Sequence, residues 1–200
     1  SFKLGAAGNI HIGYMMTVAL ADGGGTVECF ANHTPELNQN QKRSLSYAND
    51  IEPMLDQTVL LPPRTGTREI ALTKSFQALK VAARELSINR ILNQPQKGER
   101  APLGFIASGV GFAYLSHALT EMRLAERLPI LKLGMSYPVD EEIVTEFAQQ
   151  CDHIVVVEER RGFIERQVVE ILNPQKKTGR ISTKIYGKKF PGSFEPIPST

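Results

Sequence analysis

The sequence has few cysteines, and this shortage excludes two kinds of structure. Only Cys29 and Cys151 occur among the 200 residues, and they lie far apart. Small disulfide-stabilised proteins carry more cysteines at closer spacing, so the two residues are better interpreted as reduced thiols of a cytoplasmic protein. An iron–sulfur cluster bound by four thiolates cannot be assembled from this chain alone.

Charge of one sign and long apolar runs are also missing. Lys and Arg number 23 against 21 Asp and Glu, which gives a formal net charge of +2, and there is no long basic run. We therefore expect no nucleic-acid partner. No segment approaches the roughly 18 apolar residues of a membrane span, and the N-terminus lacks the features of a signal peptide. The hydrophobic fraction that is present, 42%, is typical of a globular protein with a buried core.

The second half of the chain, beyond the polar linker Asn93–Arg100, alternates short apolar runs with stretches of helical periodicity. The runs that predict strands are Leu103–Ser108, Ile130–Gly134, His153–Glu158 and Ile181–Tyr186. His153–Glu158 is β-branched and apolar almost throughout, which is typical of a central parallel strand. Strands and helices that alternate with short connections predict a mostly parallel sheet between helical layers.

Three helices are expected between these strands, each with one apolar face. The second begins at Asp140 as N-cap, with Glu141 and Glu142 in its first turn, where carboxylates favour the helix dipole. The third ends before Pro174. The residues expected to face inward are Phe112, Leu115, Leu119 and Met122 in the first helix, Ile143, Val144 and Phe147 in the second, and Phe163, Ile164, Val168, Ile171 and Leu172 in the third.

The first half of the chain is less regular. Thr67–Leu92 predicts one long helix, and Gln57–Leu61 predicts a strand closed by Pro62 and Pro63. Near the N-terminus, a helix from Asn9 to about Ala21 followed by a strand at Thr26–Phe30 competes with a hairpin of Ile10–Leu20 and Thr26–Phe30. Asn38–Asp50 is polar loop or weak helix. The residues of the long helix that form its apolar stripe are Leu72, Phe76, Leu79, Ala83 and Leu86.

Several motifs of the second half occur in an unusually particular order. Lys132-Leu133-Gly134-Met135-Ser136-Tyr137-Pro138 is followed by Val156-Val157-Glu158-Glu159 and then by Phe163-Ile164-Glu165-Arg166-Gln167. This order resembles the indolepyruvate:ferredoxin oxidoreductases, which belong to the thiamine-dependent 2-oxoacid:ferredoxin oxidoreductases. The resemblance covers roughly Val59–Phe190, and it is more specific in the second half than in the lead-in around Leu60–Pro63 and Asn89–Ile91.

The resemblance implies the domain of these enzymes that is similar to the C-terminal domain of transketolase. The implied fold is three-layer α/β/α, with a mixed and mostly parallel sheet of about five strands, one of them antiparallel. The implied role is structural: the domain supports the parts that bind thiamine diphosphate and forms contacts with other domains or subunits, including a possible homodimer. The whole enzyme would convert an aryl-pyruvate to acyl-coenzyme A and pass electrons to ferredoxin through iron–sulfur clusters.

The sequence departs from such a whole enzyme in what it lacks. No Gly-Asp-Gly motif for magnesium and thiamine diphosphate occurs, nor do clustered Cys-x-x-Cys motifs, so we expect no cofactor, catalytic residue or metal site in this chain. The chain could be a piece of a larger polypeptide or a short relative that kept only this domain, and a start at Ser1-Phe2-Lys3 without an initiator methionine favours the piece. The expected organisation is a segment 1–57 that could be a remnant of a neighbouring domain, a lead-in 58–100, the α/β domain 101–190 and a tail 191–200.

One candidate ligand site is the turn Ser108-Gly109-Val110-Gly111, which joins a strand to the start of a helix. Its backbone N–H groups could hold the phosphate of a nucleotide or of coenzyme A. The competing explanation is a tight turn that needs glycine for steric reasons, and Tyr114 stands where a dinucleotide-binding fingerprint requires its third glycine. Ser108, Gly109 and Gly111 are therefore candidate cofactor-binding residues of an alternative function, a small nucleotide- or coenzyme A-binding module.

Two further groups of charged residues deserve a functional and a structural interpretation. Glu158 and Glu159 followed by Arg160 and Arg161 could be an acid–base pair, but a salt-bridge cluster or a subunit interface is the better interpretation. The basic residues Lys176, Lys177, Lys184, Lys188 and Lys189 could form a docking surface for ferredoxin or coenzyme A, although such clusters are more often solvated surface.

The remaining reactive residues are scattered along the chain. His11 and His33 could meet Glu28 and Cys29 at a metal, but no zinc-ligand spacing is present, and His117 and His153 are expected at the surface or at caps. A third functional class, a free-standing hydrolase or transferase, lacks the Gly-x-Ser-x-Gly nucleophile motif, and neither cysteine has a recognisable base partner.

Overall fold

The computed structural model describes residues 4–5, 22–24 and 61–188. These residues fall into two compact units: Leu4–Gly5 and residues 76–188 belong to the first, and residues 22–24 and 61–75 belong to the second. The elements in chain order are α5 (Arg64–Glu85), β1 (Arg90–Leu92), β2 (Ala101–Ser108), α6 (Gly109–Glu121), β3 (Ile130–Leu133), α7 (Glu141–Gln149), β4 (Cys151–Val157), α8 (Phe163–Lys177) and β5 (Lys184–Tyr186).

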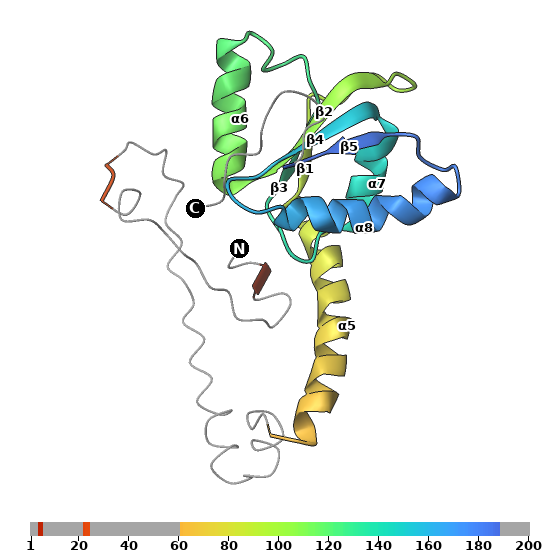
Figure 1. Cartoon of the computed structure of the whole chain (residues 1–200). Coiled ribbons are helices and arrows are strands. Elements are labelled where there is room, and N and C mark those ends of the chain that lie inside the picture. The colour runs from red at the N-terminus through yellow and green to blue at the C-terminus, as the bar shows by residue number, and fades with distance from the viewer. Residues whose placement is uncertain (1–3, 6–21, 25–60, 189–200) are drawn as a thin grey trace. The chain divides into compact units, whose positions relative to one another are not determined.

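The first unit is built on a five-stranded sheet with the strand order β1-β3-β2-β4-β5 (Figure 1). Strand β1 pairs antiparallel with β3, and the pairs β2–β3, β2–β4 and β4–β5 are parallel. The expected α/β fold with a mostly parallel mixed sheet is therefore confirmed. Strand β4 lies between two neighbours, as its β-branched apolar sequence predicted.

Helices cover both faces of this sheet, which gives three layers (Figure 1). Side chains alternate between the faces along each strand, as strand geometry requires. In β2, Ile106 packs in the core cluster that contains Val144 of α7 and Val168 of α8. Its neighbours Phe105 and Ala107 pack instead with the cluster formed around α6. Helix α6 thus covers one face of the sheet, and α7 and α8 cover the other.

The expected strands and helices of the second half all occur, with ends shifted by a few residues. The linker 93–100 connects β1 to β2, so the same sheet receives a strand from each side of the linker. Asp140 is the N-cap of α7, and its side chain accepts a hydrogen bond from the backbone N–H of Glu142. Both features of α7, its start and its buried face at Val144 and Phe147, are as predicted.

The long helix expected at Thr67–Leu92 was wrong at its end. Helix α5 stops at Glu85, and residues 90–92 form β1 instead. Ser87 adopts a left-handed conformation with φ 49°, its N–H bonds to the Arg84 carbonyl, and the N–H of Ile88 bonds back to the carbonyl of Ala83. This is the Schellman motif that ends helices, formed here by serine in place of the usual glycine. The expected apolar stripe is also incomplete, because only Leu79 and Ala83 are buried and Leu72 is 44% exposed.

Three other expectations about the helices are corrected. Met122 was expected to face inward but is 64% exposed, because α6 ends there and Leu124 packs against the core instead. Pro174 lies inside α8, which continues to Lys177 and stops before Gly179 in a left-handed conformation. Phe163 was expected to face inward but is 51% exposed at the start of α8.

The expectations for the N-terminal part lie outside the described residues. These are the helix or hairpin from Asn9 to Phe30, the loop Asn38–Asp50, and the strand Gln57–Leu61 except for Leu61, which is exposed and in no regular element. None of the described helices is long and apolar enough to cross a membrane.

Candidate functional site

The two candidate sites of the second half meet at one place in the sheet. Helices α6 and α8 leave the adjacent strands β2 and β4 toward opposite faces, which makes the carboxyl ends of these strands the topological switch point. Open α/β sheets bind ligands at such points. A side chain built on Gly111, in the first turn of α6, would lie 3.0 Å from the carbonyl oxygen of Val157. The structure therefore brings the Ser108–Gly111 turn against the residues that lead into Glu158.

Steric constraints explain why both Gly109 and Gly111 are glycine in the Ser108–Gly111 turn. Gly109 has φ 51°, a left-handed conformation that glycine adopts without strain. Gly111 is buried, and any side chain would press on the backbone of β4. Ser108 occupies the N-cap position of α6 but its hydroxyl makes no capping hydrogen bond. The steric explanation thus accounts for both glycines, and anion binding at this turn stays a prediction.

Glu158 caps the first turn of α8. Its carboxylate accepts hydrogen bonds from three consecutive backbone N–H groups, those of Phe163 (3.0 Å), Ile164 (2.7 Å) and Glu165 (3.1 Å). These groups have no partner within the helix, and a carboxylate there also favours the helix dipole. Glu158 is thus a structural residue. The salt-bridge cluster expected for residues 158–161 is not found, because no ion pair among the described residues joins Glu158 or Glu159 to Arg160 or Arg161.

We expect Glu158→Ala to lower the free energy of unfolding by about 1–2 kcal/mol, because the N–H groups of Ile164 and Glu165 lose their acceptor, while that of Phe163 keeps the carbonyl of Arg161. Urea unfolding followed by circular dichroism measures this. Glu159→Ala is the matched control, since Glu159 is the exposed neighbour, and its effect should stay within about 0.5 kcal/mol. Equal effects of the two substitutions would contradict the capping role.

A buried ion pair, which sequence reasoning missed, joins α5 to α7. Asp140 is fully buried, and Arg84 donates to both of its carboxylate oxygens, from Nε at 2.6 Å and from Nη2 at 2.7 Å. Burial raises the pKa of Asp140, but the hydrogen bonds from Arg84 and from the backbone N–H of Glu142 outweigh it, so that the pKa lies below its ordinary value. The side-chain hydrogen bond to Asp140 is in turn the main reason that the pKa of Arg84 is raised.

The loop after β3 is held by side chains from two other elements. Asn89, between α5 and β1, accepts hydrogen bonds from the N–H groups of Gly134 (3.0 Å) and Met135 (3.1 Å). Gln167 of α8 donates to the carbonyl of Ser136 at 3.0 Å and accepts from the N–H of Val139 at 2.9 Å. Together these bonds fix the backbone on both sides of Tyr137, whose side chain is 57% exposed.

The other reactive residues that the structure describes do not assemble into a site. Cys151 is a free, buried thiol, and burial raises its pKa to about 11, which keeps it protonated. His117 is exposed on α6 beside Glu121, as expected, while His153 stacks on Tyr186 within the sheet. No group of three or more potential metal ligands occurs in the described part of the chain. His11, Glu28, Cys29 and His33 lie outside the described residues.

The expected basic cluster of the C-terminal end is divided between the two edges of the sheet. Lys176 and Lys177 end α8, and Lys184 begins β5, on the side where the strands start. Lys188 lies on the other side, where its ammonium group donates to the carbonyl of Glu158. Lys176 is partly buried, and burial lowers its pKa. The described lysines therefore do not form one docking surface, and Lys189 lies outside the described residues.

The family model and the similar proteins that match this chain point to the same family. A family model described as "Indolepyruvate oxidoreductase domain" matches residues 93–194. Two relatives are named indolepyruvate oxidoreductase subunit IorA. The one from Methanothermobacter thermautotrophicus is 31% identical over 133 residues, which is 66% of this chain and 20% of that protein. The one from Methanothermobacter marburgensis is 33% identical over 116 residues, or 58% of this chain and 18% of that protein.

A solved structure is also similar in part. It is a 2-oxoglutarate:ferredoxin oxidoreductase from Magnetococcus marinus with 2-oxoglutarate, coenzyme A and succinyl-CoA bound. The sequence identity is 15% and the TM-score 0.38, with 64% of this chain and 20% of that chain covered. The chain spans about a fifth of the length of the relatives it matches from the two Methanothermobacter species.

Proposed function

Because this chain belongs to the indolepyruvate oxidoreductase domain family, we propose that it is a non-catalytic domain of a thiamine-dependent indolepyruvate (aryl-pyruvate):ferredoxin oxidoreductase. It would act through packing and interfaces within that enzyme. The whole enzyme would oxidatively decarboxylate a 2-oxoacid to acyl-coenzyme A in the cytoplasm. Its other domains or subunits are the expected partners of this chain, with ferredoxin as the electron acceptor and a homodimer as one possible assembly.

The observation that carries this proposal is the use of the domain's ionisable groups to hold the fold. Glu158 caps α8, and Asp140 is buried against Arg84. Cys151 is buried, and burial raises its pKa to about 11, which disfavours the thiolate form that a nucleophile requires. A general acid or base must exchange a proton with the substrate. A carboxylate that caps a helix or is buried in an ion pair is not available for this exchange. This pattern is what we expect of a domain that stabilises the enzyme without taking part in catalysis.

Thiamine diphosphate, magnesium and iron–sulfur clusters would then be held by other parts of the enzyme. A hard magnesium ion takes oxygen ligands, and a four-thiolate cluster takes four cysteines. The chain has no Gly-Asp-Gly motif and two cysteines, one of which is buried in the core. Coenzyme A, as co-substrate, would likewise reach the enzyme's active site outside this domain.

Isothermal titration calorimetry tests the proposal directly. We expect the purified 200-residue chain to show no binding heat with thiamine diphosphate and magnesium, while a thiamine-dependent 2-oxoacid oxidoreductase freed of its cofactor serves as positive control. Stoichiometric binding of thiamine diphosphate by the chain would overturn the proposal.

The alternative function is a small nucleotide- or coenzyme A-binding module that uses Ser108, Gly109 and Gly111. One observation favours it: the start of α6 lies at the switch point and receives no side-chain cap. Coenzyme A in the same titration separates the two functions. Stoichiometric binding of coenzyme A would support the alternative function. If coenzyme A does not bind, the result favours the non-catalytic domain.

A further inference from the structure

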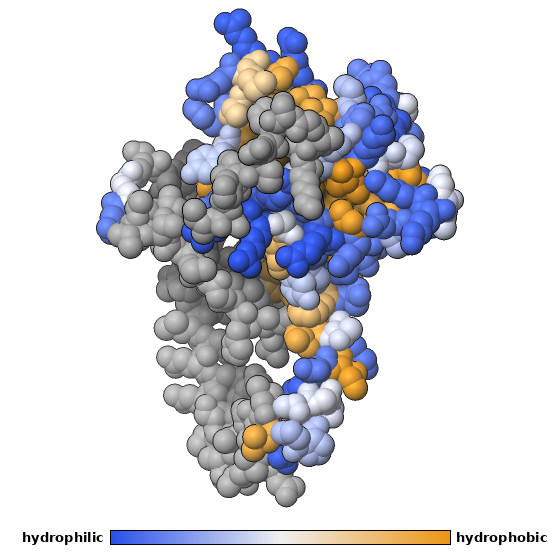
Figure 2. Space-filling model, in the orientation of Figure 1, coloured by the Kyte–Doolittle hydropathy of each residue, from blue (hydrophilic) through white to orange (hydrophobic). Residues whose placement is uncertain are grey.

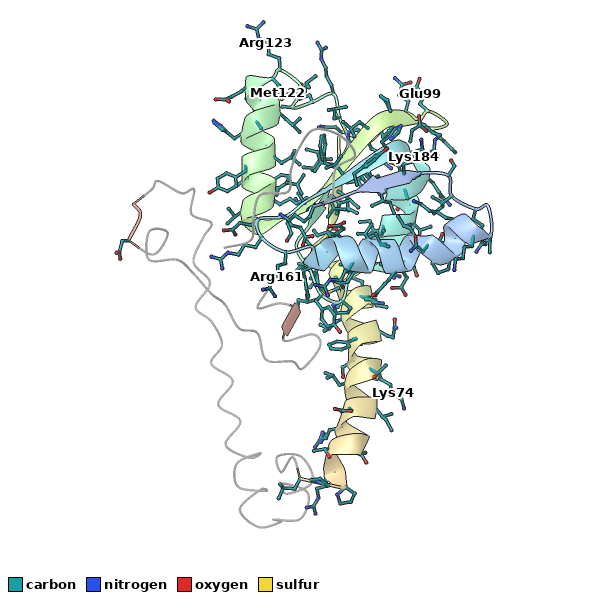
Figure 3. The ribbon with its side chains drawn as sticks, viewed as in Figure 1. Lys74, Glu99, Met122, Arg123, Arg161 and Lys184 are labelled. Carbon is teal, nitrogen blue, oxygen red and sulfur yellow. The ribbon has the colours of Figure 1, made fainter. Side chains whose placement is uncertain are left out.

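Exposed aromatic and arginine side chains lie together at the carboxyl edge of the sheet. Tyr137 follows β3 and is 57% exposed, and Phe163 begins α8 and is 51% exposed. Arg160 and Arg161, in the loop between β4 and α8, are exposed as well. We call these four residues the aromatic–arginine surface. Figure 3 shows Arg161 beside the start of α8 and Arg123 far from it, just beyond the C-terminal end of α6.

The aromatic rings of this surface are held in place although they are exposed. The ring of Tyr137 packs edge-on against Phe76 of α5, with centroids 5.6 Å apart, and lies 6.0 Å from the ring of Phe163. The backbone on each side of Tyr137 is fixed by the hydrogen bonds of Gln167 with Ser136 and with Val139. A surface that is already ordered loses little conformational entropy when a partner binds, which favours affinity.

The positive charge of the surface has no ion-pair partner among the residues that the structure describes. No ion pair among the described residues involves Arg160 or Arg161. Two of the nearby carboxylates already accept backbone hydrogen bonds, Glu158 from the start of α8 and Glu165 from the N–H of Lys188 at 3.0 Å. Glu159 is the exposed carboxylate that remains. Figure 2 shows hydrophilic side chains gathered where α8 begins, next to hydrophobic ones of α5.

This composition matches the residues that carry binding energy in protein interfaces. Tyrosine, phenylalanine and arginine are enriched at the centres of interfaces, and single residues of these types often dominate the affinity. An apolar side chain of a partner would cover the rings of Tyr137 and Phe163. Carboxylates of the same partner would face Arg160 and Arg161, where guanidinium groups bind carboxylates with two parallel hydrogen bonds.

We propose that the aromatic–arginine surface binds an acidic protein segment that carries an apolar side chain. The inference rests on the proposed function, since a domain that acts through interfaces needs a defined contact surface, and the partner would be another domain or subunit of the enzyme. Glu158, which the sequence placed among the interface candidates, belongs to the support of this surface: it fixes the turn that presents Phe163.

The probe for the test is a short synthetic peptide of alternating Glu and Gly residues with one central Phe. Its binding to the isotope-labelled 200-residue chain is followed by NMR, through the backbone signals of residues 136–137 and 160–163. We expect the combined substitutions Arg160→Ala and Arg161→Ala, and separately Tyr137→Ala, to weaken binding by about tenfold or more. Arg123→Ala with Arg127→Ala is the matched control, because both arginines are exposed away from the surface, and it should change binding by no more than about twofold.

Two altered peptides identify what is recognised. Replacing each Glu by Gln tests the charge, and replacing the Phe by Ala tests the apolar contact, and both should weaken binding. Equal binding of the Gln peptide, equal losses in the Arg123 and Arg127 control, or equally tight binding of inorganic polyphosphate would overturn the inference. These results leave the proposed function in place, because that function depends on the calorimetry with thiamine diphosphate.

Discussion

Replacing Arg84 with alanine is expected to lower the free energy of unfolding by about 3–5 kcal/mol, because it leaves the buried carboxylate of Asp140 without its hydrogen-bonded cation. Asp140 is fully buried and keeps only the N–H of Glu142 as a donor in the variant. The chain has no tryptophan, so circular dichroism during urea unfolding is a suitable measurement.

The Lys80–Glu141 pair provides the matched control for this experiment. It joins the same two helices, but Glu141 is about half exposed. The Lys80 side chain is 12% exposed, but its partner Glu141 is reached by water and is left solvated in Lys80→Ala, so this substitution should have a smaller effect than Arg84→Ala. Similar effects of the two substitutions would show that the buried position of Asp140 does not matter.

The effect of Arg84 should also depend on pH, and the direction follows from the pKa of Asp140. A carboxyl group whose pKa is lowered by folding stabilises the protein above its unfolded pKa of about 3.9, and this contribution is lost as the pH falls through the lower folded value. In Arg84→Ala, burial raises the pKa of Asp140 without the opposing hydrogen bonds from Arg84. Protonation of Asp140 then removes the buried negative charge and stabilises the variant. The difference in stability between the two proteins should therefore shrink from about pH 7 to about pH 3.5. A difference that stays constant would contradict this account.

Replacing Phe147 with alanine is the second substitution with a large expected effect, a loss of about 3–5 kcal/mol in the free energy of unfolding. Phe147 is fully buried between α7 and the sheet, and its ring lies where Gly104 has no side chain: a Cβ built on Gly104 would be 2.9 Å from the ring. Truncation would open a cavity in the middle of the larger core cluster. Urea unfolding, as for Arg84, gives the measurement.

Phe163→Ala is the control of the same residue type. Because Phe163 is half exposed, the substitution removes little buried area and should cost less than about 1 kcal/mol. If Phe163→Ala were as destabilising as Phe147→Ala, the assignment of Phe163 to a binding surface would lose its basis.

The sequence predicted those parts of the fold that local patterns determine. The β-branched run of β4, the cap and acidic first turn of α7, and the alternation of strands and helices all depend on neighbouring residues. The end of α5 could not be read in the same way. Its stop is a left-handed serine, Ser87, where a glycine would have been the recognisable signal. Pro174 misled in the opposite sense, because the actual stop signal is Gly179.

The candidate site was predicted in its location but not in its chemistry. That Ser108–Gly111 and Glu158–Arg161 both follow strands was visible in the sequence, and parallel strands bring such ends to one edge. The partner of Glu158 is a helix end five to seven residues away, which residue types alone do not reveal. Arg84 and Asp140 are 56 residues apart, and their contact depends on how α5 and α7 pack. The exposure of Tyr137 and Phe163 likewise depends on how α5, the loop after β3 and the start of α8 pack together.

The residues that hold β3 reach further upstream than the stretch that the family model matches. That stretch begins at residue 93, whereas Arg84, Asn89 and β1 precede it. A polypeptide starting at residue 93 would lose the cation of Asp140, the acceptor for the N–H groups of Gly134 and Met135, and the antiparallel neighbour of β3. A self-contained version of this domain therefore has to include the end of α5.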